Sequence, residues 1–139
     1  LVEAGAVARL VGPRIGRMPT ADGDTLDADA SLENEPGFLF DALVLPDGEE
    51  GVAALAQDGR TLEFIKDQFR HCKTILALGA ASTLMLKAGL PAAMDKSHAL
   101  GTSGLIFADA GSAAAAAAEF IAGVARHRHF GREMDPPLL

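Results

Sequence analysis

The stretches FDALVLPDG, residues 40–48, and TILALG, residues 74–79, decide the fold of this chain. Each contains a short apolar run that stops at a turn and is followed by a helical pattern. Continuous apolar runs are typical of parallel strands that helices cover on both faces. In open parallel sheets, ligands and catalytic groups collect at the carboxyl ends of such strands. The turns after these two runs are therefore the first places to look for a functional site.

The rest of the chain repeats the same alternation of strands and helices. We expect strands at residues 6–11, 42–45, 74–78 and 104–108, and helices at 51–57, 61–71, 82–87 and 113–126. Ser82 and Ser112 stand where side chains that cap the last two helices belong. A small hairpin is expected around Asp22-Gly23, a dipeptide typical of two-residue type I′ turns. This order predicts an α/β domain with a doubly wound parallel sheet of flavodoxin-like type.

The beginning of the chain is unusual for that topology. Residues 1–6 read as the last turn of a helix that stops at Gly5, and no strand precedes them. The first strand of a flavodoxin-like sheet is central, so its absence predicts a gap between the strand at 6–11 and the strand at 42–45. We expect one domain over residues 1–139, a fragment of a longer polypeptide that is unstable without the upstream segment. The tail 132–139 is expected to be irregular and to pack on another part of the protein.

Composition restricts the function classes. The chain has 139 residues, of which 49% are hydrophobic and 22% charged, as in an ordinary globular domain. A net charge of −7 argues against a nucleic acid or an anionic membrane as partner. No apolar run is long enough to span a bilayer, and we expect no signal peptide. The single cysteine, Cys72, fits a reducing compartment, so a cytoplasmic location is expected.

Several motifs carry a family resemblance. FDALVLPDG at 40–48 resembles the strand and turn of class I glutamine-amidotransferase-like domains, which include intracellular-protease and deglycase-like proteins. An ordered set over nearly the whole chain looks like the C-terminal domain of large-subunit haem catalases. That set is DALVLPDG at 41–48, LGAA at 78–81, KAGLP at 87–91, GLIFAD at 104–109 and RHRHF at 126–130.

This resemblance implies a function for the whole polypeptide and none for this chain alone. In those catalases a haem-bearing core decomposes hydrogen peroxide to water and oxygen, and the C-terminal extension is a structural appendage that packs on the core of a tetramer. The haem and the catalytic residues are implied to lie upstream. The chain contains no Tyr, the residue type that ligates haem in this family. The implied partners are therefore the catalase core and other copies of the same polypeptide.

The other resemblance leaves an alternative function. In active members of the amidotransferase-like superfamily, a nucleophilic Cys stands at the position that Gly79 occupies here. Gly79 has neither sulfur nor oxygen, so the resemblance implies a degenerate site with no catalytic, cofactor-binding or metal-binding residue. The alternative is a free-standing superfamily member that acts as a chaperone or detoxifies carbonyls. A chaperone would not need the missing nucleophile.

Other residues invite functional interpretations that the residue patterns do not favour. Cys72 lies between His71 and Lys73, which could activate its thiol, but a small buried or half-buried thiol at the start of a strand is the simpler interpretation. The basic run at 126–132 could bind a metal or an anion. His127 and His129 are two residues apart, however, so on a helix they would point to different sides. Favourable interaction with the helix dipole, or ion pairs with another domain, explains the run better.

Two loops complete the candidates. Asp22, Asp24, Asp27 and Asp29 suggest calcium, but Leu26 stands where a calcium loop requires an oxygen ligand, so a solvated hairpin is expected. The segment 101–104 contains two glycines and could cradle an anion, but it enters a strand instead of opening a helix. His98 is expected to be an ordinary surface histidine.

Overall fold

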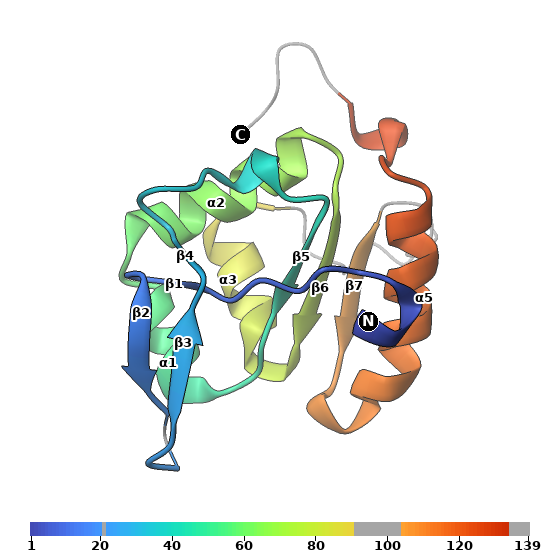
Figure 1. The fold of residues 1–139 in the computed structure, drawn as a ribbon. Helices are drawn as coiled ribbons and strands as arrows, with labels where there is room; N and C mark the ends of the chain where they lie inside the picture. Colours follow the sequence, from blue (N-terminus) through green and yellow to red (C-terminus); the bar gives the residue numbers. More distant parts are fainter. Residues whose placement is uncertain (21, 91–103, 134–139) are drawn as a thin grey trace.

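A parallel sheet of three strands forms the centre of the molecule (Figure 1). The computed structural model describes residues 1–20, 22–90 and 104–133. The strands lie in the order β5 (Ala42–Leu45), β6 (Thr74–Leu78) and β7 (Leu105–Ala108). Leu43 is aligned with Ile75, and Ile75 with Leu105. The predicted bounds of the first two strands are confirmed, and the third begins one residue later than predicted.

Helices cover both faces of this sheet. On one face lie α1 (Glu49–Leu55), α2 (Gly59–Arg70) and α3 (Ser82–Lys87), and on the other lies α5 (Ala113–Ala125). Successive residues of a strand point to opposite faces, so Ile75 and Ala77 belong to the first core while Leu76 and Leu78 pack with α5. The doubly wound α/β architecture predicted from the sequence is confirmed.

The helices follow their amphipathic patterns. Ile65 on α2 is 1% exposed, and Leu62 and Phe69 pack on the same core. Asp58 caps α2, since its carboxylate accepts a hydrogen bond from the backbone N–H of Arg60 at 2.9 Å. The predicted cap at Ser82 is wrong. Ser82 is the first residue of α3, and its hydroxyl donates backward to the carbonyl of Gly79.

The second predicted cap is right in position only. Ser112 occupies the N-cap of α5, but its side chain makes no capping hydrogen bond with the described residues. The end of α3 behaves as its sequence indicates. Gly89 has a φ of +81°, and the N–H of Leu90 donates to the carbonyl of Met85 at 3.0 Å, which closes the last turn.

The amino-terminal part differs most from the prediction. A single 3₁₀ turn, η1 (Val2–Ala4), ends at Gly5 with a φ of +86°. The predicted strand at 6–11 is wrong: only β1 (Val11–Gly12) is a strand, and it pairs with β4 (Ala30–Ser31) outside the central sheet. Side-chain interactions fix the two residues that precede β1. Arg9 pairs with Glu35 at 2.7 Å, and the N–H of Leu10 donates to Asp29 at 2.8 Å.

The predicted hairpin exists but its turn is longer. It consists of β2 (Gly16–Pro19) and β3 (Thr25–Ala28), which are antiparallel. The prediction of a two-residue turn at Asp22-Gly23 is wrong, because the paired strands end at Pro19 and Thr25. The N–H of Thr20 donates to the carbonyl of Asp24 at 2.9 Å, which closes the loop.

Short 3₁₀ turns connect the main elements: η2 (Gly37–Leu39), η3 (Gly79–Ala81), η4 (Ala110–Ser112) and η5 (Phe130–Arg132). Buried Gln68 on α2 fixes η2, since its side-chain N–H₂ donates to the carbonyls of Gly37 and Phe40. Among the described residues, β5 has a strand partner on one edge only, where the predicted topology lacks its central strand. No helix in the described part of the chain is long and apolar enough to cross a membrane.

Candidate functional site

The turn after β6 has the backbone geometry of a sharp strand-to-helix elbow. Gly79 follows β6 with a φ of +51°, a left-handed conformation that side chains rarely adopt. The turn η3 and then α3 follow without a break. An added Cβ at Gly79 would overlap the carboxylate of Asp47. Both the conformation and the Asp47 carboxylate therefore disfavour a side chain at this position.

Asp47 comes from the turn after β5 and closes the elbow. Its Oδ1 accepts hydrogen bonds from the N–H of Ala80 and the N–H of Gly48, both at 2.8 Å. These two bonds, that of Ala80 first, lower the pKa of the Asp47 carboxyl below its ordinary value of 3.8. The anionic carboxylate therefore accepts hydrogen bonds from backbone N–H groups of the elbow, beside the position where a nucleophile would stand.

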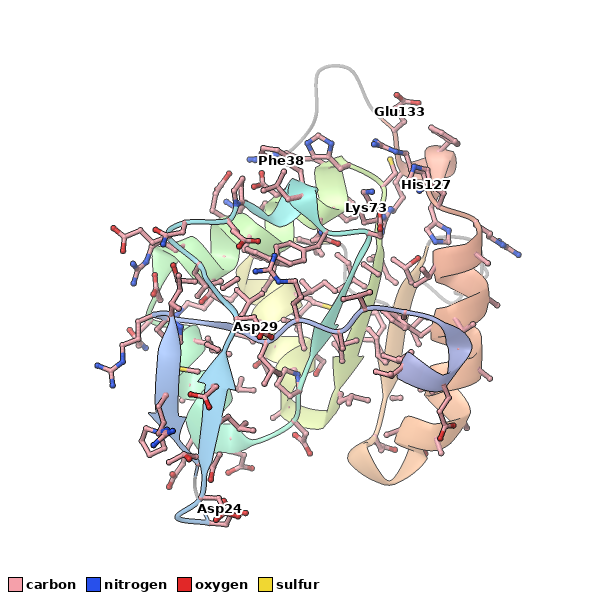
Figure 2. All side chains as sticks on the ribbon, in the orientation of Figure 1. Asp24, Asp29, Phe38, Lys73, His127 and Glu133 are labelled. Carbon is pink, nitrogen blue, oxygen red and sulfur yellow. The ribbon has the colours of Figure 1, made fainter. Side chains whose placement is uncertain are left out.

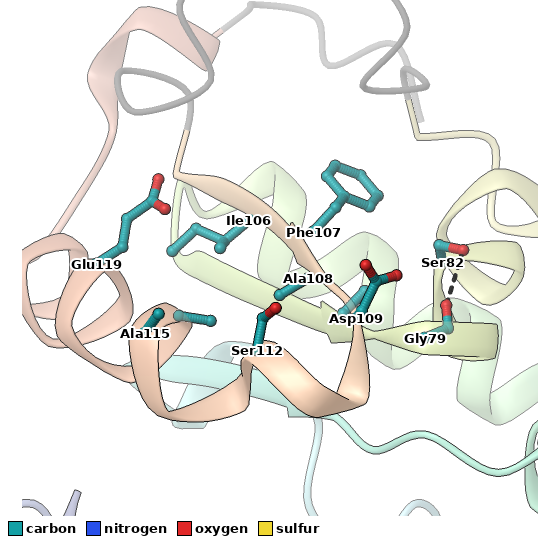
Figure 3. Close-up of a pocket in the computed structure, with 11 residues that line it drawn as sticks. Gly79, Ser82, Ile106, Phe107, Ala108, Asp109, Ser112, Ala115 and Glu119 are labelled. Atoms are coloured by element: carbon teal, nitrogen blue, oxygen red, sulfur yellow. Dashed lines mark hydrogen bonds between the residues drawn. The ribbon is translucent and has the colours of Figure 1, made fainter.

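An open pocket lies beside the elbow, at the carboxyl ends of β6 and β7 (Figure 3). Its volume is about 470 Å³, and its polar lining comes from Ser82, Asp109, Ser112 and Glu119. The hydroxyl of Ser82 lies 3.0 Å from the carbonyl of Gly79, to which it donates. Ile106, Phe107 and small residues of β7 and α5 form most of the remaining wall.

The pocket lacks the parts of a nucleophilic site. Its lining contains no His, Cys, Lys or Arg within the described residues. The proton of Ser82 is directed at a backbone carbonyl instead of a general base, and no base faces Ser112 in the lining. Two carboxylates, Asp109 and Glu119, make the pocket a poor place for an anionic substrate.

The described residues do not fit a haem. The usual protein ligands of haem iron are His, Cys, Met and Tyr, none of which lines the large pocket, and the chain has no Tyr. A smaller cavity of about 200 Å³ includes His129 in its wall. His129 is 4% exposed, and its Nε2 is hydrogen-bonded to the hydroxyl of Thr74 at 2.9 Å.

Cys72 is buried, as predicted, at the amino end of β6. It is 3% exposed and has a φ of +57°. The guanidinium of Arg132 lies nearby, donates to the carbonyl of Lys73 and stacks on Phe69 at 5.0 Å. Burial lowers the pKa of Arg132 to about 10, an effect that the neighbouring Cys72 partly opposes.

The basic run after α5 is divided between surface and interior. The helix ends at Ala125, one residue before the predicted end, and His127 and His129 lie beyond it. His127 is exposed with a φ of +63°, while His129 is buried and donates its backbone N–H to Cys72. The two imidazoles therefore do not converge on one ligand.

The remaining candidates do not come together as sites. Asp22 and Asp24 lie in the hairpin loop, where the hydroxyl of Thr20 lowers the pKa of Asp22. Within the described ranges, no group of three or more His, Cys, Asp or Glu side chains could hold a metal ion. His98 and residues 101–103 lie outside the described residues. Gly104 packs its backbone against the ring of His129.

Two contacts were not anticipated from the sequence. Asp47 belongs to the motif at 41–48, but its bond to Ala80 spans 33 residues. The signal was present, because Asp47 and Gly79 follow adjacent parallel strands whose carboxyl ends meet. The burial of Arg132 had no such signal, since it lies in a segment predicted to be irregular.

Solved structures define the fold class. The chain is similar to the crystal structure of VC2308 protein, with a TM-score of 0.70 and 24% identity over 99% of this chain and 82% of that chain. It is also similar to a THiJ/PfpI family protein from Pseudomonas syringae, with a TM-score of 0.62 and 21% identity over 92% of this chain and 60% of that chain. The predicted flavodoxin-like fold is confirmed.

Sequence relatives define the family within that class. Residues 1–134 match the model of the C-terminal domain found in long catalases, so this chain belongs to that domain family. Catalase C of Rhizobium meliloti (strain 1021) is 35% identical over 92% of this chain and 17% of its own length. Catalase-1 of Neurospora crassa is 32% identical over 94% of this chain and 20% of its own length. The chain spans a fifth or less of the length of these two catalases.

Proposed function

We propose that this chain is the non-catalytic C-terminal domain of a large haem catalase whose remaining, longer part decomposes hydrogen peroxide. The observation that carries the proposal is the family match over residues 1–134 to a domain of long catalases. Relatives five to six times longer support a catalytic part outside these 139 residues. The domain supports the stability and tetrameric assembly of that polypeptide in the cytoplasm.

The chemistry of the elbow supports a structural instead of an enzymatic role. A nucleophile requires a reactive atom and an activating neighbour. Gly79 supplies no such atom, and Asp47 already holds the N–H of Ala80. We therefore assign no catalytic residue to the chain. The same geometry speaks against a carbonyl-detoxifying enzyme of the THiJ/PfpI type.

The open edge of β5 supports an incomplete domain. Its outer N–H and C=O groups have no strand partner among the described residues, and Val44 is 36% exposed. Unpaired strand edges readily accept another strand. A strand from the upstream part of the polypeptide would complete the sheet here.

Removal of these 139 residues from the native polypeptide tests the proposal. Peroxide turnover per haem should be preserved within about twofold, since no reacting group is lost, while thermal stability and tetramer content should fall. The isolated chain should turn over neither hydrogen peroxide nor methylglyoxal. Loss of turnover in a truncated protein that retains its haem and its tetramer would contradict a non-catalytic role.

A further inference from the structure

Positive charge is concentrated at the amino-terminal end of the sheet. The segments 70–73 and 126–132 contain five of the 12 Lys and Arg residues and three of the four His residues, and neither contains Asp or Glu. They pack together, since Arg128 donates to the carbonyl of His71 and His129 to that of Cys72. The chain as a whole has a net charge of −7, so the charge at this end is opposite in sign to that of the molecule as a whole.

The opposite end of the molecule carries acidic groups. Figure 2 places Lys73, His127 and Phe38 together, far from Asp24 in the hairpin loop. The carboxylate of Asp47 closes the elbow at the carboxyl ends of the strands, and Glu49 and Glu50 begin α1 beside it. Such segregation of charge orients a molecule toward an oppositely charged partner.

Large apolar side chains border the cationic groups. Phe38 is 45% exposed and Leu39 61%, and the ring of Phe38 lies 5.3 Å from that of His71. Phe130, on the other border, is 65% exposed. Aromatic residues and Arg are enriched in protein interfaces, where the aromatic ring supplies buried area and the guanidinium supplies directed hydrogen bonds. We call this surface the basic face; it consists of Phe38, Leu39, His71, His127, Arg128 and Phe130.

The cations beneath the basic face are incompletely neutralised by the described residues. Lys73 is 4% exposed, and among the described residues its Nζ pairs only with the exposed carboxylate of Asp41, at 3.3 Å. The Nε and Nη1 of Arg132 are buried without a hydrogen-bond partner in the described part of the chain. Desolvated positive charge that lacks compensation favours a partner that brings negative charge. The carboxylates near this end are those of Asp41, Glu63, Asp67 and Glu133, and Arg70 engages both Glu63 and Asp67.

We propose that the basic face docks onto an acidic surface of the part of the polypeptide that lies outside these 139 residues. This inference rests on the proposed function, which supplies that larger part. The lengths of the relatives favour this partner, because this chain covers only 17% of Catalase C and 20% of Catalase-1. Most of the surface that the basic face could contact would therefore belong to the rest of the polypeptide. Opposite charge selects the patch, and Phe38, Leu39 and Phe130 supply its apolar contact.

A photo-cross-linking residue in the native polypeptide tests the docking. Phe130→p-benzoylphenylalanine places the probe at the border of the basic face, and Leu26→p-benzoylphenylalanine, at a site 51% exposed on the distant hairpin, is the matched control. Mass spectrometry should locate the Phe130 cross-link in an Asp- and Glu-rich peptide outside these 139 residues. The control probe should not reach that peptide.

Charge reversal tests whether electrostatics drives the contact. Arg128→Glu should lower the yield of the cross-link at least about tenfold, because like charges would then face each other. Arg17→Glu, the same change on the hairpin, should leave the yield unchanged. Absence of a cross-link, or a cross-link confined to these 139 residues of either copy, would overturn the docking.

Visible absorption of the same sample separates the two proposals. A haem band with a failed cross-link overturns the docking alone. A haem-free polypeptide overturns the proposed function. The docking partner proposed for the basic face is then overturned as well, whether or not a cross-link forms.

Discussion

The change Gly79→Ala should destabilise the domain even though it adds a single methyl group. A non-glycine residue at a φ of +51° costs about 1–2 kcal/mol relative to an ordinary conformation. The added Cβ would also displace the Asp47 carboxylate from the N–H of Ala80. Gly51→Ala is the matched control. It lies in α1 with no atom near its Cβ, so alanine should stabilise it by about 0.5–1 kcal/mol.

Hydrogen exchange in the native polypeptide measures the effect, since the chain has no Trp or Tyr to report it by fluorescence. A loss of 1–2 kcal/mol should accelerate exchange of the amides of β6 by about 5- to 30-fold. The double variant Asp47→Ala/Gly79→Ala should exchange more slowly than the sum of the single changes predicts, because the overlap is gone. Wild-type exchange in Gly79→Ala, or strictly additive effects, would refute this account of the elbow.

The same contact has a predictable pH dependence. The pKa of Asp47 in the folded protein lies below its ordinary value of 3.8. Its stabilising effect should therefore be complete above pH 3.8 and be lost as the pH falls through the folded pKa. The difference in exchange rate between wild type and Asp47→Ala should be constant at neutral pH and vanish in acid. A difference that grows on acidification would contradict the assignment.

Three further changes address the packing of the domain. Gln68→Leu should cost about 1–3 kcal/mol, because the buried carbonyls of Gly37 and Phe40 lose the side-chain N–H₂ that donates to both; faster exchange near η2 would reveal it, and unchanged exchange would exclude this role of Gln68. Gly123→Val should cost about 1–3 kcal/mol, since a Cβ there would lie 2.8 Å from the Thr74 side chain; thermal unfolding checks this, with Gly51→Ala as control. The buried thiol of Cys72 should react with a disulfide reagent far more slowly in the native than in the unfolded protein, and equal rates would contradict its burial.

Local patterns predicted the central sheet and its helices because the apolar pattern within each element indicates which of its side chains are buried. The strands at 42–45 and 74–78 are continuous apolar runs that only a covered parallel sheet accommodates. The helix at 59–70 carries its apolar stripe at helical spacing. The segment 6–11 also looked like a strand, but strand pairing among the described residues begins only at Val11. Before it, Arg9 pairs with the Glu35 side chain, and the N–H of Leu10 donates to the Asp29 side chain.

The candidate site was predictable in position but not in its contents. The turn at Gly79 follows from the end of β6, whereas the contact with Asp47 depends on the alignment of two strands. Ser82 looked like a cap because the type of residue favours one, but the 3₁₀ turn at Gly79–Ala81 begins the helical path earlier. The buried Arg132 depends on how the segment after α5 folds back onto residues 70–73, which no local pattern encodes.

The most direct test of the proposed function is the visible absorption spectrum of the polypeptide purified from its native gene, with its denatured size measured in the same sample. A domain of a large haem catalase predicts a Soret band on a polypeptide five to six times longer than 139 residues, as in Catalase C and Catalase-1. A colourless polypeptide of about the length of this chain would contradict the proposal.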